Sequence, residues 1–158
     1  MTQAVIPPVR TSVRVARPPE EVFRVFTQEM GQWWPLQTHS IAVDSLEGKV
    51  RAETVVFDGW AGGHIYERMD DGREADWGHV LVWEPPHRVV FSWKPNLTRG
   101  PHTEVEVRFS PEGAGTRVDL EHRGWERLRP DRQPMRDTYE TGWPEVLDKL
   151  VRHLGGSA

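Results

Sequence analysis

The chain has 158 residues, no cysteine and a formal net charge of −4, so it can bury the core of one domain but offers neither disulfides nor cysteine-bound zinc. Lysine and arginine are scattered rather than gathered in a basic patch, so we expect no binding to nucleic acid or to a membrane surface. The sequence shows no signal peptide and no apolar run of membrane-spanning length, which makes the cytoplasm the expected compartment.

The first part of the chain predicts a flexible arm followed by a strand. Proline occurs twice within residues 1–10, which we expect to be a loose N-terminal arm. Residues 11–17 alternate between apolar and polar and predict the first strand. A single domain is expected over 11–154, with 155–158 as a C-terminal tail.

Two short helices are expected after this strand. Pro18 and Pro19 suit the first turn of a helix, where the missing N–H costs nothing, and apolar residues follow at helical spacing. Trp33 and Trp34 come next, between a glycine and a proline, so we expect a second brief helix or turn to hold them.

The middle of the chain predicts an antiparallel sheet. Short alternating segments are separated by turns rich in Gly, Pro, Asp and Asn, a pattern typical of consecutive antiparallel strands. The expected strands cover about 50–57, 63–69, 74–84, 87–94, 103–110 and 115–124. Their alternation predicts one face in water and one face covered.

A long C-terminal helix is expected to cover that second face. Over about 134–154 apolar residues recur at intervals of three and four, and Gly155-Gly156 follow as a helix stop. Pro144 lies inside this segment and predicts a kink around 140–144 rather than a break. The expected fold is therefore α+β, a curved seven-stranded antiparallel sheet wrapped around a long C-terminal helix.

Large rings and histidines fall on the face expected to meet this helix. In WGHVLVWEPPHRVVFSW simple alternation directs several of them inward, where Val or Ile would suffice to fill a core. Rings with polar edges on a concave apolar wall are typical of a ligand pocket, and Gly142 on the covering helix leaves room for a guest. The alternative is that the indoles only fill the core. The candidate ligand-binding residues are Trp33, Trp34, Tyr66, Trp77, His79, Leu81, Phe91, Trp93, His122, Tyr139 and Trp143.

Histidine is the candidate acid–base group because it titrates near neutral pH. His79 and His122 are expected to face inward, and His39 is expected at the mouth of the cavity. No HxH or HExxH spacing, P-loop, GxSxG or GxGxxG motif occurs, so we expect no metal site and no cofactor and assign no catalytic residue.

The chain over residues 11–154 resembles a known family. The matching segments, in order, are PPEEVFRVFT, GQWWP, AGGHIYERMDDG, WGHVLVWEPPHRVVFSW, GTRVDLEHRGW and GWPEVLDKLVRHL. They resemble the Hsp90 ATPase activator homologue 1-like (AHSA1-like) branch of the SRPBCC or START/Bet v 1-like superfamily. The resemblance implies a helix-grip fold with a cavity between the sheet and the long helix. It also implies that many relatives bind hydrophobic small molecules there, while a few act as enzymes or cochaperones.

The leading expectation is the binding of a hydrophobic, aromatic or polycyclic small molecule in that cavity. One alternative is an enzyme of the polyketide cyclase or hydrolase type that uses a pocket histidine. A second is a module that interacts with an Hsp90-type chaperone, although the activators that give the family its name carry a further N-terminal domain. Trp60, in the loop DGWAGG, leaves self-association to a homodimer open.

Overall fold

The strands of the protein form one sheet in the computed structural model, which describes residues 6–46, 49–94, 101–128 and 132–156. This sheet has seven antiparallel strands in the order β1-β7-β6-β5-β4-β3-β2. The strands are β1 (Val9–Val15), β2 (Ala52–Phe57), β3 (His64–Met69), β4 (Glu74–Glu84), β5 (Arg88–Trp93), β6 (Thr103–Glu112) and β7 (Gly115–Arg123). The predicted six-strand meander is confirmed, and the first strand returns to pair with the last.

Short helices follow β1, and the longest helix closes the described part of the chain. The helices are α1 (Pro19–Gln28), α2 (Met30–Trp33), α3 (Ile41–Ser45), the 3-10 turn η1 (Trp125–Arg127) and α4 (Arg132–His153). The two helices expected after the first strand are confirmed, but α3 was not expected. It is only five residues long, too short to show a helical apolar stripe, and it begins where the side chain of Ser40 accepts a hydrogen bond from the N–H of Val43 at 3.2 Å.

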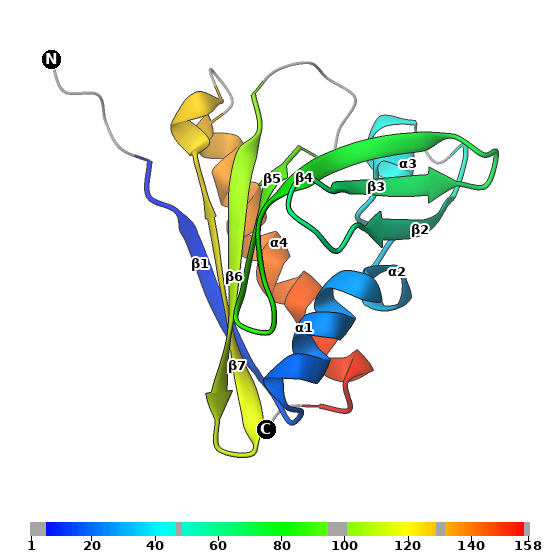
Figure 1. Ribbon diagram of the computed structural model, residues 1–158. Coiled ribbons are helices and arrows are strands. Elements are labelled where there is room, and N and C mark those ends of the chain that lie inside the picture. The colour runs from blue at the N-terminus through cyan, green and yellow to red at the C-terminus, as the bar shows by residue number, and fades with distance from the viewer. Residues whose placement is uncertain (1–5, 47–48, 95–100, 129–131, 157–158) are drawn as a thin grey trace, which may run out of the picture.

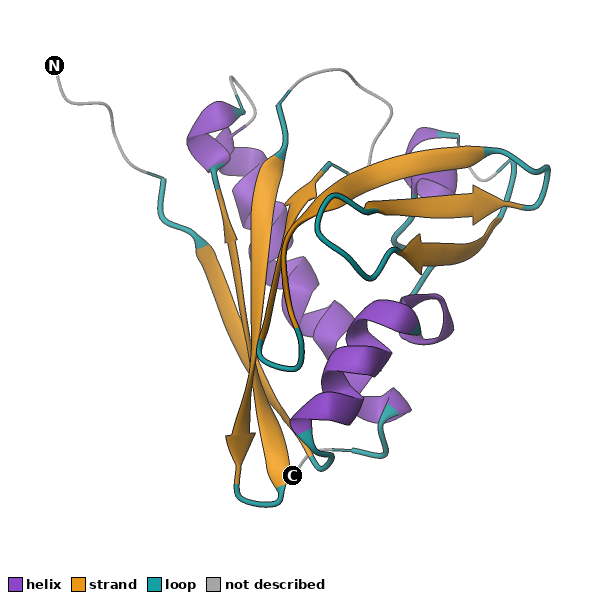
Figure 2. Cartoon of the chain, viewed as in Figure 1, coloured by secondary structure: helices purple, strands orange, loops and turns teal. Residues whose placement is uncertain are grey.

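Helix α4 lies against the concave side of the curled sheet (Figures 1 and 2). The strands β1, β6 and β7 lie on one side of this helix, and β2, β3 and β4 lie on its other side. Its buried side chains include Trp143 and Leu147, which pack into the main core. The helix runs on through Pro144, so the predicted absence of a break is confirmed. It ends as expected, with Gly155 at a φ of 94° and the N–H of Gly156 donating to the carbonyl of Val151. The predicted helix-grip architecture is confirmed. None of the described helices combines the length and apolarity needed to span a bilayer.

The first strand begins and ends two residues earlier than expected, at Val9 and Val15. Val9 and Arg10 already pair with β7. Arg136 of α4 donates to the carbonyls of Pro7 and Pro8, at 2.8 and 3.2 Å, and so ties this segment to the long helix. Residues 1–5 of the expected arm lie outside the described residues.

Two β-bulges in β4 change which side chains face the core. The register shifts beside Trp77, opposite Ile65 and Tyr66 of β3, and again at Leu81, opposite β5. Each extra residue reverses the alternation. Trp77 is therefore fully buried while His79 is exposed and Leu81 is 43% exposed. The prediction that these three residues share one inward face is wrong for His79 and Leu81.

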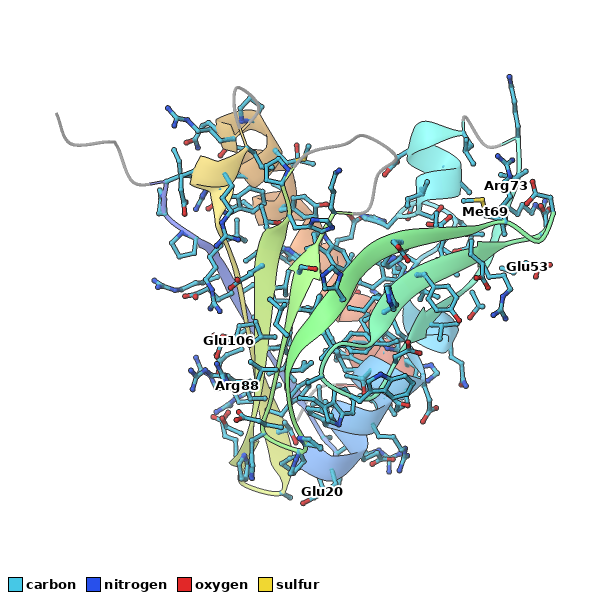
Figure 3. The ribbon with its side chains drawn as sticks, turned by 45° about the horizontal axis from the view of Figure 1, so that its top comes forward. Glu20, Glu53, Met69, Arg73, Arg88 and Glu106 are labelled. Carbon is cyan, nitrogen blue, oxygen red and sulfur yellow. The ribbon has the colours of Figure 1, made fainter. Side chains whose placement is uncertain are left out.

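Ion pairs cover the opposite, convex face of the sheet. Arg88 of β5 and Arg123 of β7 bind the carboxylate of Glu106 on β6 between them, at 2.8 and 2.6 Å; Figure 3 labels Arg88 and Glu106 side by side. Burial acts to raise the pKa of Glu106, but the hydrogen bonds from the two arginines outweigh it and lower this pKa to about 2. This face is the hydrated side that the alternation predicted.

Candidate functional site

A pocket of about 130 Å³ lies between α4, the end of β5 and the segment that connects α2 to α3. Its rim residues Asp44 and Thr138 are exposed, so it opens to solvent there. The pocket is lined by Trp34, His39, Asp44, Trp93, Thr138, Tyr139, Gly142, Trp143 and Val146. The structure thus brings together four of the predicted ligand-binding residues, Trp34, Trp93, Tyr139 and Trp143.

Three indoles form the walls of this pocket. The ring centroids of Trp34, Trp93 and Trp143 lie 5.5 to 5.9 Å apart in tilted or edge-on contacts, an arrangement that aromatic rings favour. All three side chains are buried, yet each borders the pocket. Because the indoles pack on one another, the walls are firm and apolar.

Behind these walls a buried chain of hydrogen bonds fixes His122. The indole N–H of Trp143 can only donate, so His122 Nδ1, 2.9 Å away, is the acceptor and carries no proton. The other ring nitrogen, Nε2, then donates to Thr103 Oγ1 at 2.6 Å, and Thr103 donates to the carbonyl of Trp93 at 3.1 Å. Burial lowers the pKa of His122 to about 3. His122 therefore holds Trp143 in place as a neutral imidazole and has no free nitrogen for proton transfer.

Tyr139 brings a hydroxyl into the pocket from α4. Its oxygen accepts a hydrogen bond from the indole N–H of Trp93 at 3.1 Å. Burial raises the pKa of Tyr139 to about 12, and the nearby charge of Asp44 acts in the same direction. The phenol consequently keeps its proton at neutral pH.

The rim of the pocket carries the acid–base groups. His39 lies at the mouth as expected, with its ring Nδ1 2.7 Å from the hydroxyl of Thr38 and its carbonyl bound by the indole N–H of Trp34 at 2.8 Å. Partial burial raises the pKa of Asp44, which the charge of His39 partly offsets. A Cβ built on Gly142 would meet no atom within 4 Å, so the room expected beside this glycine is confirmed.

A buried carboxylate, which the sequence analysis missed, anchors the rim. Glu67 on β3 accepts the backbone N–H groups of Ile41 and Ala42 at 2.6 and 3.0 Å, and the indole N–H of Trp77 at 2.8 Å. It thereby satisfies the first N–H groups of α3, the helix that carries Asp44. Its position between two inward-facing apolar residues of β3 was a signal that could have revealed it.

The remaining candidates lie outside the pocket. Trp33, Trp77 and Phe91 are buried in the core, and the indole N–H of Trp33 is used by the carbonyl of Val25 at 2.9 Å. Tyr66 and His79 face the other side of the sheet, away from α4, since the inward positions of β3 are Ile65, Glu67 and Met69.

These positions change the choice of acid–base residue. The inward orientation expected for His79 is wrong, and His122 is inward but fully engaged, so the histidine that borders the pocket is His39. Among the described residues, no group of three or more His, Cys, Asp or Glu side chains has a geometry that could hold a metal ion.

Comparisons with known proteins give a family match. The family described as "Activator of Hsp90 ATPase homolog 1-like protein" matches residues 16–155. A comparison with curated proteins gives no match.

Several solved structures are similar over nearly the whole chain. An anthrahydroquino-gamma-pyrone synthase, Txn09, solved in complex with SUM, is 31% identical, with 97% of this chain and 98% of that chain covered and a TM-score of 0.57. MLL2253 from Mesorhizobium loti is 22% identical, with 92% and 94% covered and a TM-score of 0.65. DynU16, from the dynemicin biosynthetic locus, is 20% identical with a TM-score of 0.66, and this chain covers 47% of it. For MLL2253 and DynU16, the similarity shows a shared fold.

Proposed function

We propose, since the chain belongs to the Activator of Hsp90 ATPase homolog 1-like protein family, that it binds an aromatic small molecule in the pocket between α4 and the sheet. The observation that carries this proposal is the pocket itself, walled by Trp34, Trp93 and Trp143 and open beside Gly142. Indole faces suit a flat ring, and a few polar groups at the edge of an apolar cleft are the usual means of orienting a ligand.

The size of the pocket limits the ligand and its affinity. At about 130 Å³ it is smaller than the roughly 300 Å³ at which drug-sized ligand pockets begin. We therefore expect it to enclose one or two fused rings, with any further rings extending past the rim. Burial of about 150 Å² of ring surface at about 25 cal/mol per Å² gives about 4 kcal/mol before ordering costs, which corresponds to millimolar affinity from the rings alone. Tighter binding requires polar contacts.

Tryptophan fluorescence during titration with one- and two-ring aromatic compounds tests the proposal. A bound ring should quench or shift the emission in a saturable way, and Gly142→Leu, which fills the pocket, should remove the change. Trp60→Phe is the matched control, because Trp60 is 58% exposed and lies outside the pocket. A response that survives Gly142→Leu but disappears with Trp60→Phe would contradict the proposal.

A second candidate function is catalysis of ring closure on such a ligand. It is favoured by the 31% identity to a protein described as a gamma-pyrone synthase and by His39 and Asp44 at the pocket rim. Cyclisation of a carbonyl compound needs a base near the ligand and a donor near its oxygen, and His39 and Tyr139 could supply these. Loss of turnover in His39→Ala with unchanged binding would favour this candidate; equal turnover would remove it.

Interaction with an Hsp90-type chaperone is the alternative that the family description raises. The ATPase rate of such a chaperone, measured with and without the purified protein, decides it. An unchanged rate at saturating protein removes this alternative and leaves the two proposals that use the pocket.

A further inference from the structure

The hydroxyl of Tyr139 has a hydrogen-bond donor to spare. The indole N–H of Trp93 is a donor only, so in the 3.1 Å contact with Tyr139 the tyrosine oxygen must accept. The tyrosine's own proton then points elsewhere. Among the residues that the structure describes, the hydroxyl of Tyr139 takes part in the bond with Trp93 and donates to no acceptor.

The other donors of the pocket walls are already used. The indole N–H of Trp34 binds the carbonyl of His39, and that of Trp143 binds His122 Nδ1. At the rim, the hydroxyl of Thr138 donates to the carbonyl of Pro134 at 3.0 Å. On the walls, the phenol of Tyr139 is therefore the donor left for a guest, with the ring of His39 at the rim. Burial keeps the phenol protonated by raising its pKa to about 12.

We infer that the ligand places a carbonyl oxygen, or an equivalent acceptor on its ring system, against the hydroxyl of Tyr139. This inference rests on the proposed function and narrows it to aromatic ketones, quinones and pyrones, as opposed to plain hydrocarbons and arylamines. A buried donor left without a partner costs free energy, so a ligand that lacks the acceptor is disfavoured even when its shape fits.

A matched pair of bicyclic compounds tests this assignment. 1-Tetralone and tetralin have the same carbon skeleton and differ only in the carbonyl oxygen. Each is titrated into ¹⁵N-labelled protein, with the tryptophan indole N–H resonances as the readout of binding. Each titration is repeated with Tyr139→Phe and with Tyr66→Phe, a control at the chain's other tyrosine, which lies outside the pocket.

We expect Tyr139→Phe to lower the ratio of the 1-tetralone affinity to the tetralin affinity on the order of tenfold. This factor corresponds to the free energy of one buried hydrogen bond. Tyr66→Phe should leave both affinities unchanged. If both compounds bind and Tyr139→Phe does not alter the ratio of their affinities, the inference is wrong and the proposed function stands. If neither compound binds, the proposed function fails, and the inference fails with it.

The wild-type protein gives a test that does not depend on the variant folding. The Trp93 indole N–H already donates to the tyrosine oxygen, so its resonance should respond more to 1-tetralone, which polarises that hydroxyl, than to tetralin. An equal response of the Trp93 resonance to the two compounds would contradict the inference.

Discussion

Acid should destabilise the protein through His122, and His122→Gln should remove much of this sensitivity. In the folded protein burial holds the pKa of His122 at about 3, whereas an unperturbed histidine titrates near 6.5. Between these values the unfolded chain binds a proton that the folded protein refuses, so stability falls as pH decreases. The loss is about 1.4 kcal/mol per pH unit, or about 2.7 kcal/mol at pH 4.5.

Glutamine is the suitable replacement because its side-chain amide offers an acceptor oxygen and an NH2 donor group and does not titrate. It can accept from Trp143 and donate to Thr103, as the histidine does. Urea unfolding at pH 7 and pH 4.5 should show a stability difference that is about 2.7 kcal/mol smaller in His122→Gln than in the wild type. His153→Gln, at an exposed position on α4, should match the wild type. Equal pH dependence of the wild type and His122→Gln would show that His122 is not the source of the acid sensitivity.

Three further substitutions give effects of predictable sign. Gly142→Ala should raise the free energy of unfolding by about 1 kcal/mol, since alanine favours a helix, yet weaken ligand binding because its methyl group enters the pocket; thermal unfolding and a ligand titration measure the two, and unchanged affinity would count against the pocket. Glu67→Gln should cost about 2 kcal/mol, because a neutral amide cannot accept from three donors, while Glu53→Gln, an exposed acid on the neighbouring strand, should change stability by less than about 0.5 kcal/mol. Equal losses in these two variants would contradict the anchoring role. Glu106→Gln should lower the free energy of unfolding by at most about 3 kcal/mol at pH 7. The pKa of Glu106 is depressed in the folded protein, so the stability that its charge provides is lost as pH falls from 4.5 towards 2. At pH 3.5 the difference in stability between the wild type and the variant should therefore be about 1.4 kcal/mol smaller than at pH 7.

Much of the architecture could be predicted from the sequence because periodicity follows burial. The alternation in β6 and β7 gave the two faces of the sheet correctly, and the apolar stripe of α4 gave the covering helix. Proline after the first strand and glycine after the last helix marked helix ends for local steric reasons. Each of these signals lies within a single strand or helix and its flanking residues, so it can be recognised in the sequence without knowing the fold.

The candidate site was predicted only in part because it depends on contacts between distant segments. The bulge beside Trp77 turned His79 outward, and it requires glycine at position 78, where a Cβ would collide with the carbonyl oxygen of Ser92. Asp44 lies on α3, a helix too short to be recognised in the sequence. Glu67, on the distant strand β3, holds this helix in position by accepting the N–H of Ile41. Neither effect leaves a periodic pattern.

The most direct test of the central claim is a map of the eight tryptophan indole N–H resonances during titration with 1-tetralone. We expect the resonances of Trp34, Trp93 and Trp143, which wall the pocket, to shift together with one affinity, while that of the exposed Trp60 stays unchanged. Shifts confined to Trp60, or no saturable shift of the three pocket indoles, would contradict the central claim and leave the aromatic cluster as a packed core.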